Sequence, residues 1–274
     1  MPTIPPGSAP DVEQEPHRHR QLAESFGLDP ERYHRTRPRY PEAMVQAIVD
    51  ASPGPAILDV GCGTGIAARQ FEDAGCQVLG VEVDARMAEF ARRHGLQVEV
   101  SAFEAWRPAG RTFDAVVAGQ TWHWVDPVAG AAKAAEVLRA GGRLALFWNM
   151  FQPSPEVADA FSAVYRRVGP DLPYRPWRAP VPDESSSFFA RPADGIRGAE
   201  AFSDPERWRF AWQRSYTRDE WLDQLPTAGG HNRLPADQLE ALLSGTGAAI
   251  DALGGSFTMR YDTVVITAVR TVST

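Results

Sequence analysis

The chain has 274 residues and a formal net charge of −7, a length that suits one large domain or one domain with a smaller attachment. The acidic balance argues against an enzyme that neutralises many nucleic-acid phosphates, and it favours a small-molecule partner over DNA or RNA. The hydrophobic fraction of 43% is ordinary for a globular domain, and no apolar run reaches the length of a membrane helix.

The N-terminal stretch MPTIPPGSAPDVEQEPHRHR has prolines, acids and histidines where a secretory signal has a basic start and an apolar block. We therefore expect a cytoplasmic protein without a membrane partner. Cys62 and Cys76 are the only cysteines, too few for a disulfide framework, and we expect free thiols. Three of the histidines, His17, His19 and His34, lie in or near this polar segment, and we expect no metal site.

From Pro55 to about Asn149, short β-rich runs alternate with helical patterns, which is typical of βαβ units around a parallel sheet. Asp126 and Pro127 fit the start of the last helix, and Gly141 fits its end. We expect strands at 56–60, 77–83, 96–100, 113–118 and 143–148, and helices near 65–74, 85–94 and 127–139.

Beyond Asn149 this alternation stops. Residues 151–202 are rich in Pro and Arg, with one expected helix at 155–168, and are typical of an insertion or cap. Order returns with an expected strand at 208–215 and with Thr217 to Glu220, which fits a capping box that opens a short helix. A longer helix at 235–253 and a strand at 257–269 complete the chain.

The stretch ILDVGCGTG, residues 57–65, places three glycines between an expected strand and an expected helix. Gly61, Gly63 and Gly65 let a ligand approach the backbone, and the helix N-terminus offers unpaired N–H groups. Their G-x-G-x-G spacing differs from the G-x-G-x-x-G of dinucleotide sites, because Ile66 occupies the position of the third glycine. The spacing therefore disfavours an NAD oxidoreductase.

Two acidic residues at strand ends indicate which chemical groups the ligand carries. Asp59, before the glycines, would repel a pyrophosphate but suits a cationic amino group. Glu82, followed by Val83 at the end of the second strand, can accept hydrogen bonds from the hydroxyls of a ribose. A nucleoside joined to an amino acid fits both acids, and S-adenosylmethionine is such a molecule.

At these residues the sequence resembles the class I S-adenosylmethionine-dependent methyltransferases. LDVGCGTG matches the first motif of that family, and Glu82 matches its ribose acid. ERYHRTRPRYP and SYTRDEWLDQL resemble a small-molecule branch related to trans-aconitate and quinone-biosynthesis methyltransferases. The resemblance implies a Rossmann-like, doubly wound α/β fold with a seven-stranded sheet whose last strands are antiparallel. It also implies S-adenosylmethionine as cofactor and S-adenosylhomocysteine as product.

The resemblance also implies roles for individual residues. In Y-x-x-x-R-P-x-Y-P, Tyr33 and Arg37 belong to a lid over the cofactor and Tyr40 to the substrate side. Many relatives have an Asp near the adenine where this chain has Ala102, so only a backbone or stacking role passes to Phe103. The remaining residues expected around the methionine end of the cofactor are Gly119, Gln120 and Thr121.

The segment GQTWHWVD leaves the fourth expected strand at the edge where open α/β sheets bind ligands. His123 lies there, and its near-neutral pKa would let it accept a proton from a hydroxyl or amine as the methyl group arrives. The alternative is that His123 only shapes the pocket. Trp122, Trp124 and Trp148 are expected to line a pocket that suits an apolar or aromatic substrate.

These features predict a methyltransferase that transfers a methyl group to O, N or C of a small molecule. The alternatives are a non-catalytic S-adenosylmethionine-binding or scaffolding protein of the same fold, and an RNA methyltransferase, which the acidic charge disfavours. The acceptor and the oligomeric state stay open. The expected parts are an N-terminal tail and lid at 1–41, a cofactor-binding core at 42–150, a cap insertion at 151–202, and a segment at 203–274 that completes the sheet.

Overall fold

The computed structural model describes residues 25–168, 186–228 and 230–271. The chain divides into two compact units, each formed from three stretches of sequence. Unit 1 takes Met1–Pro38, Asn149–Val181 and Ala211–Asp262, and unit 2 takes Arg39–Trp148, Pro182–Phe210 and Thr263–Thr274, as far as these stretches are described. The fourfold division expected from the sequence stays a prediction.

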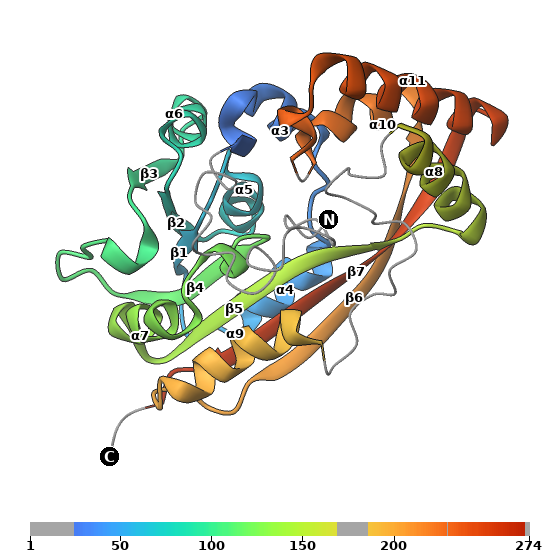
Figure 1. Cartoon of the computed structure of the whole chain (residues 1–274). Helices are drawn as coiled ribbons and strands as arrows, with labels where there is room; N and C mark the ends of the chain where they lie inside the picture. The colour runs from blue at the N-terminus through green and yellow to red at the C-terminus, as the bar shows by residue number, and fades with distance from the viewer. Residues whose placement is uncertain (1–24, 169–185, 229, 272–274) are drawn as a thin grey trace. The chain divides into compact units, whose positions relative to one another are not determined.

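A seven-stranded sheet in the order β3-β2-β1-β4-β5-β7-β6 is the framework of the fold (Figure 1). The pairs β1–β2, β1–β4, β2–β3 and β4–β5 are parallel. The strands are β1 (Ala56–Val60), β2 (Gln77–Glu82), β3 (Gln97–Val100), β4 (Phe113–Gly119), β5 (Leu138–Gln152), β6 (Glu206–Thr217) and β7 (Ser256–Val269).

The last strand runs antiparallel to both of its neighbours. Gly141 N–H donates to Arg270 O while Arg270 N–H donates to Gly142 O, an exchange between β5 and the end of β7. On the other side, Ser203 N–H donates to Val269 O, and the bridge between Phe202 and Arg270 is antiparallel. The expected α/β fold with antiparallel last strands is confirmed.

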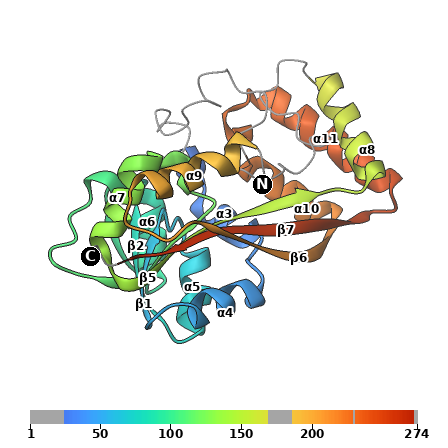
Figure 2. The same cartoon turned by 90° about the horizontal axis from the view of Figure 1, so that it is seen from below.

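Helices of unit 2 cover both faces of its part of the sheet. Figure 2 shows α4 and α5 on one face and α7 and α9 on the other. α9 comes so close to α7 that a Cβ on Gly195 would collide with the Pro127 carbonyl oxygen. The helices of this unit are α4 (Glu42–Asp50), α5 (Ile66–Asp73), α6 (Ala85–Arg93), α7 (Pro127–Val137) and α9 (Ser187–Gly198).

Unit 1 has its own aromatic core. The Phe161 ring stacks on Trp221 at 5.8 Å and meets Phe257 edge-on at 5.4 Å between ring centroids. Arg32 and Arg35 of its first helix bind Asp223 at 2.9 and 2.8 Å, which ties that helix to α10. The helices of this unit are α3 (Pro30–Thr36), α8 (Pro155–Val168), α10 (Arg218–Gln224) and α11 (Ala236–Ala252).

Helix starts are predicted correctly where a side chain of the expected capping residue accepts hydrogen bonds from backbone N–H groups. The Asp126 carboxylate accepts hydrogen bonds from Val128 and Ala129 N–H at the start of α7, and Thr217 and Glu220 form the expected capping box. The expected role of Gly141 is wrong. α7 ends at Val137 and β5 begins at once, so Gly141, with φ +77°, adopts a left-handed conformation inside that strand, where the pairing with β4 shifts register.

Candidate functional site

The candidate site lies in unit 2, at the carboxyl ends of its parallel strands. The register of β1 pairs Asp59 with Gly80 of β2 and with Val117 of β4. The strand ends therefore bring Asp59, Glu82 and the segment after Gly119 to the same edge of the sheet, where open α/β sheets bind ligands.

The three glycines after β1 differ in what surrounds them. All have positive φ, at +64°, +56° and +84° for Gly61, Gly63 and Gly65. A Cβ on Gly61 would collide with Thr121 Cγ2, so this glycine makes room for a side chain of the protein. A Cβ on Gly63 would meet nothing within 4 Å, which makes Gly63 the position open to a ligand. Gly61 is thus required by the packing of Thr121, and the expected role of the three glycines in cofactor binding stays a prediction.

Glu82 holds the glycine turn through its carboxylate. Oε2 accepts a hydrogen bond from Gly63 N–H at 2.8 Å, and Oε1 accepts from Val83 and Asp84 N–H, each at 2.9 Å. A carboxylate has about four lone-pair positions, so these three donors leave room for one more hydroxyl unless a bond is exchanged. Burial raises the pKa of Glu82, against the lowering effect of the three N–H groups.

Asp59 is the least satisfied group at this edge. Its side chain is 1% exposed, and neither carboxylate oxygen has a hydrogen-bond partner. Burial and, to a smaller extent, the negative charge of Glu82 together raise the pKa of Asp59 to about 8, against a smaller lowering effect of the Ala68 N–H. A buried carboxylate without a donor is costly, and a bound cation would relieve that cost.

The segment after β4 closes the same site. Thr121 Oγ1 donates to Gly61 O or Gly119 O, both at 3.1 Å, and so ties the β4 loop to the glycine turn. Gln120 is left-handed with φ +59°, and its N–H donates to Phe147 O at 2.8 Å. A left-handed residue with a side chain stores strain, typical of a ligand-binding loop.

This strain gives a testable prediction. Gln120→Gly and the control Glu200→Gly, at another left-handed position with φ 52°, should each raise the free energy of unfolding by about 1 kcal/mol. Only Gln120→Gly should also weaken cofactor binding, on the order of tenfold. Urea unfolding and calorimetry measure the two effects. Equal cofactor affinity in both variants would remove Gln120 from the site.

Tyr40 and Phe103 border this edge from two other elements. The Tyr40 ring packs edge-on against Phe147 at 4.7 Å, and its hydroxyl would lie 2.6 Å from a Cβ on Gly119. The buried Phe103 packs against Trp122 at 6.0 Å, and the next residue, Glu104, accepts a hydrogen bond from Asp126 N–H at 2.9 Å. Glu104 therefore braces the start of α7.

The tryptophans expected at a pocket have different surroundings. Trp122 is 1% exposed, and its ring packs against Phe103 and closely against the Gly130 position of α7, so the structure gives a packing role where a pocket wall was expected. Trp148 is fully buried, and Trp124 packs beside His123 at 5.0 Å.

Sequence reasoning missed two phenylalanines of α9. Phe188 lies 5.8 Å from the His123 ring and 5.4 Å from Trp148, and Phe189 lies 5.9 Å from Trp148. The available signal was Ser186, whose side chain caps α9. Pro192 lies within the same helix, and because proline disfavours helix interiors it argued against a helix here.

Tyr33 and Arg37 belong to unit 1. The Arg37 guanidinium lies over the Tyr33 ring at 4.9 Å. Arg37 is 7% exposed, and its Nε has no hydrogen-bond partner. Burial raises the pKa of Tyr216 and lowers that of His231, and the charge of Arg37 has a smaller lowering effect on both. Their expected lid role stays a prediction.

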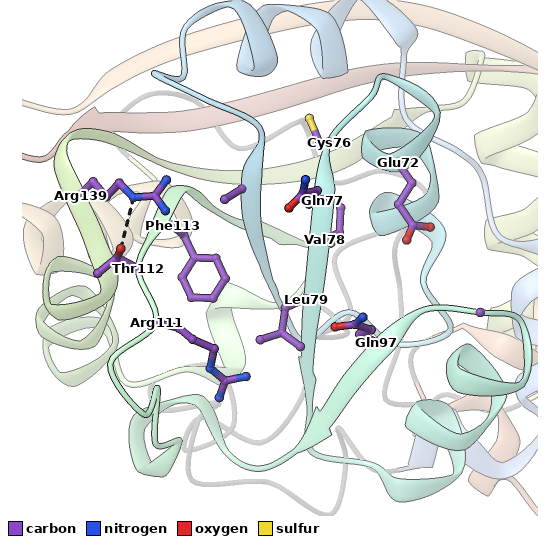
Figure 3. A pocket seen from close by; sticks show the side chains of 12 residues that line it. Glu72, Cys76, Gln77, Val78, Leu79, Gln97, Arg111, Thr112, Phe113 and Arg139 are labelled. Atoms are coloured by element: carbon purple, nitrogen blue, oxygen red, sulfur yellow. Dashed lines mark hydrogen bonds between the residues drawn. The ribbon is translucent and has the colours of Figure 1, made fainter.

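A cavity of about 700 Å³ opens at the other end of the strands (Figure 3). Arg111 and Arg139 line it, but Glu99 and Asp114 already neutralise them. Both arginines of this cavity are therefore already paired with carboxylates. In the part of the chain that the structure describes, no group of three or more His, Cys, Asp or Glu side chains is placed to hold a metal ion. Within the same residues, no helix is long and apolar enough to cross a membrane.

Comparison with known proteins identifies the framework of this site. Residues 58–146, from β1 into β5, match the family model described as a methyltransferase domain. This stretch of the chain is similar to a methyltransferase domain. Both cysteines, as expected, are free and buried in it.

Relatives with curated names agree with this assignment. The chain is 34% identical over 132 residues to an uncharacterised methyltransferase of Mycobacterium tuberculosis, covering 47% of this chain and 54% of the relative. It is 32% identical over 114 residues to a malonyl-[acyl-carrier protein] O-methyltransferase of Enterobacter lignolyticus, covering 39% and 44%. The chain spans about half the length of the curated relatives it matches.

A solved structure extends the similarity of fold to most of the chain. A proposed type II methyltransferase from Anaeromyxobacter dehalogenans aligns with a TM-score of 0.56 and 21% identity, covering 84% of this chain and 97% of that one. At this identity the likeness concerns the fold alone, and the Rossmann-like α/β fold with a seven-stranded sheet that the sequence predicts is confirmed.

Proposed function

We propose that the protein is an S-adenosylmethionine-dependent methyltransferase that acts on a small molecule. The observation that carries the proposal is Asp59, a buried carboxylate whose two oxygens lack hydrogen-bond partners beside a glycine turn open at Gly63. A cationic amino group would satisfy Asp59, and Glu82 retains capacity for a ribose hydroxyl. The residues present therefore fit the cofactor.

The residues of unit 2 would bind and orient the reactants. Asp59 would hold the amino group of the cofactor, Glu82 its ribose, and Gln120 and Thr121 its methionine end. The bound cofactor supplies a methyl group on a sulfonium, activated for in-line displacement. Orientation of two bound reactants can lower a barrier by roughly 7–11 kcal/mol in well-aligned cases, so the protein needs little further chemistry.

The acceptor is proposed from the rings near His123. The rings of Trp124 and Phe188 pack beside His123 at this strand edge, which suits an apolar or aromatic small molecule. The net charge of −7 favours such an acceptor over a nucleic acid. A cytoplasmic location is part of the same proposal.

A turnover screen tests this function. Wild-type protein is incubated with S-adenosylmethionine and a panel of aromatic, amine and carboxylic acid metabolites, and release of S-adenosylhomocysteine is measured. Glu82→Gln is the variant with weakened cofactor binding, tested at a limiting S-adenosylmethionine concentration, and Glu99→Gln, on the neighbouring β3, is the control. Turnover with at least one acceptor that depends on Glu82 and not on Glu99 supports the proposal. Tight cofactor binding without turnover across a broad panel favours the non-catalytic alternative.

A further inference from the structure

His123 and Trp148 come together because their strands are parallel neighbours. β4 and β5 pair Gly119 with Phe147, so the residues that follow lie at the same edge. His123 is in the short 3-10 helix Trp122–Trp124 after β4, and Trp148 directly follows Phe147 in β5. Trp148 Nε1 lies 3.2 Å from His123 Nδ1, and both side chains are buried.

The chemistry of the two rings fixes the position of the histidine proton. An indole N–H can only donate, so Trp148 donates to His123 Nδ1, which must carry a lone pair. A neutral imidazole has one N–H, and in His123 it is therefore on Nε2. The rings of Phe188 and Phe189 also pack edge-on against the indole, at 5.4 and 5.9 Å between centroids.

The surroundings keep this ring neutral. Burial lowers the pKa of His123 to about 3, so the ring carries no charge near neutral pH. The described rings that pack on it, from Trp124, Trp148 and Phe188, have no titratable group. A general base has to accept a proton, and here Nδ1 already accepts one hydrogen bond while Nε2 already carries its proton.

We propose that Trp148 is a positioning residue that holds His123 as the neutral tautomer protonated at Nε2, so that His123 acts as a hydrogen-bond donor and not as a general base. The catalytic part of this inference rests on the function proposed above. A ligand group that meets this histidine must offer a lone pair, as a carbonyl or carboxylate oxygen does.

The inference narrows the class of methyl acceptor. A nucleophile that keeps its proton until transfer would need a base, whereas a carboxylate, a free amine or a carbon nucleophile does not. For a carboxylate acceptor, the O–CH₃ bond forms as the S–CH₃ bond breaks. The sulfur keeps the electron pair and becomes a neutral thioether, and no proton is released.

Nitrogen NMR of ¹⁵N-histidine-labelled protein tests the tautomer without any ligand. We expect the two-bond correlations of His123, assigned with His123→Gln, to show the Nε2–H tautomer with no titration between about pH 5.5 and pH 8.5. His231 is the internal reference of opposite tautomer, because its Nδ1 lies 2.6 Å from the Ala228 carbonyl oxygen and Nε2 lies 2.7 Å from the Tyr165 hydroxyl. An Nδ1–H tautomer for His123, or a titration within that range, overturns the proposal.

Trp148→Phe tests the positioning role. This variant keeps a ring in the core but removes the indole N–H, and we expect a mixture of His123 tautomers in its spectrum. An unchanged, pure Nε2–H spectrum in a folded variant contradicts the role of Trp148. If the variant does not fold, the wild-type spectrum still decides the tautomer.

Kinetics with an acceptor supply the catalytic readout. His123→Gln keeps an N–H donor and should lower the rate on the order of tenfold. An acid limb in the wild-type pH–rate profile that disappears in His123→Gln, with a loss of about 10²–10⁴-fold, would show a base and overturn the proposal. Failure of cofactor binding would refute the proposed function and leave the NMR result intact, so the two failures are distinguishable.

Discussion

Glu82→Gln should weaken S-adenosylmethionine binding by about 10–100-fold, because a hydrogen bond to a charged acceptor contributes roughly 1.5–3 kcal/mol. The glutamine retains one carbonyl oxygen for the Val83 and Asp84 N–H groups, which Oε1 serves in the wild type. Its amide nitrogen cannot accept from Gly63 N–H or from a ribose hydroxyl. Calorimetric titration of the folded variant measures the loss.

The control for this prediction is Glu99→Gln. Glu99 is on the neighbouring strand β3, where it binds Arg111 at 2.6 Å on the surface of unit 2. An exposed ion pair contributes little, so this variant should keep the wild-type affinity and nearly the wild-type stability. Equal losses of affinity in both variants would mean that Glu82 acts through general destabilisation and not through the ligand.

Asp59 should make cofactor affinity increase with pH. With a pKa of about 8, the free protein carries a protonated Asp59 at neutral pH, whereas a cationic amino group favours the carboxylate. Binding then releases a proton, and affinity should rise up to about tenfold per pH unit until the pH reaches the pKa. Calorimetry in buffers of different ionisation enthalpy counts the released proton. Asp59→Asn should abolish both the proton release and the dependence on pH.

The same group should lower stability at high pH in the absence of cofactor. The folded-state pKa of Asp59, about 8, lies above the ordinary aspartate value of 3.8, so between these values the folded protein binds more protons than the unfolded chain. The free energy of unfolding therefore falls as pH rises through this range. Burial also raises the pKa of Glu82, which acts in the same direction, so the Asp59→Asn difference isolates Asp59. A wild-type slope retained in Asp59→Asn would contradict the assignment.

Much of the sheet could be predicted because its determinants are local. The motif from Ile57 to Gly65 fixes a strand, a turn and a helix start within a few residues, and each element forms nearly where expected. Asp126 and Thr217 mark helix starts because their side chains satisfy backbone N–H groups in the same turn. Pattern-based predictions succeed where the deciding contacts are near in sequence.

The remainder depends on contacts that are distant in sequence. Gly61 is needed because Thr121, 60 residues away, occupies the space beside it, and Trp122 turns inward because Gly130 of α7 lets its ring approach. Nothing near His123 in sequence specifies its tautomer, since Trp148 is 25 residues away. Composition and spacing could therefore indicate which edge of the sheet binds a ligand. They could not indicate the individual role of each residue at that edge.

The most direct test of the central claim, that the ends of β1 and β2 hold S-adenosylmethionine, is calorimetric titration of the cofactor into wild-type protein and into Asp59→Ala/Glu82→Ala. We expect one site per chain in the wild type and no measurable binding in the double variant, with both samples folded at the temperature of the titration. An absence of binding to the wild type, or an affinity unchanged in the folded double variant, would contradict the account.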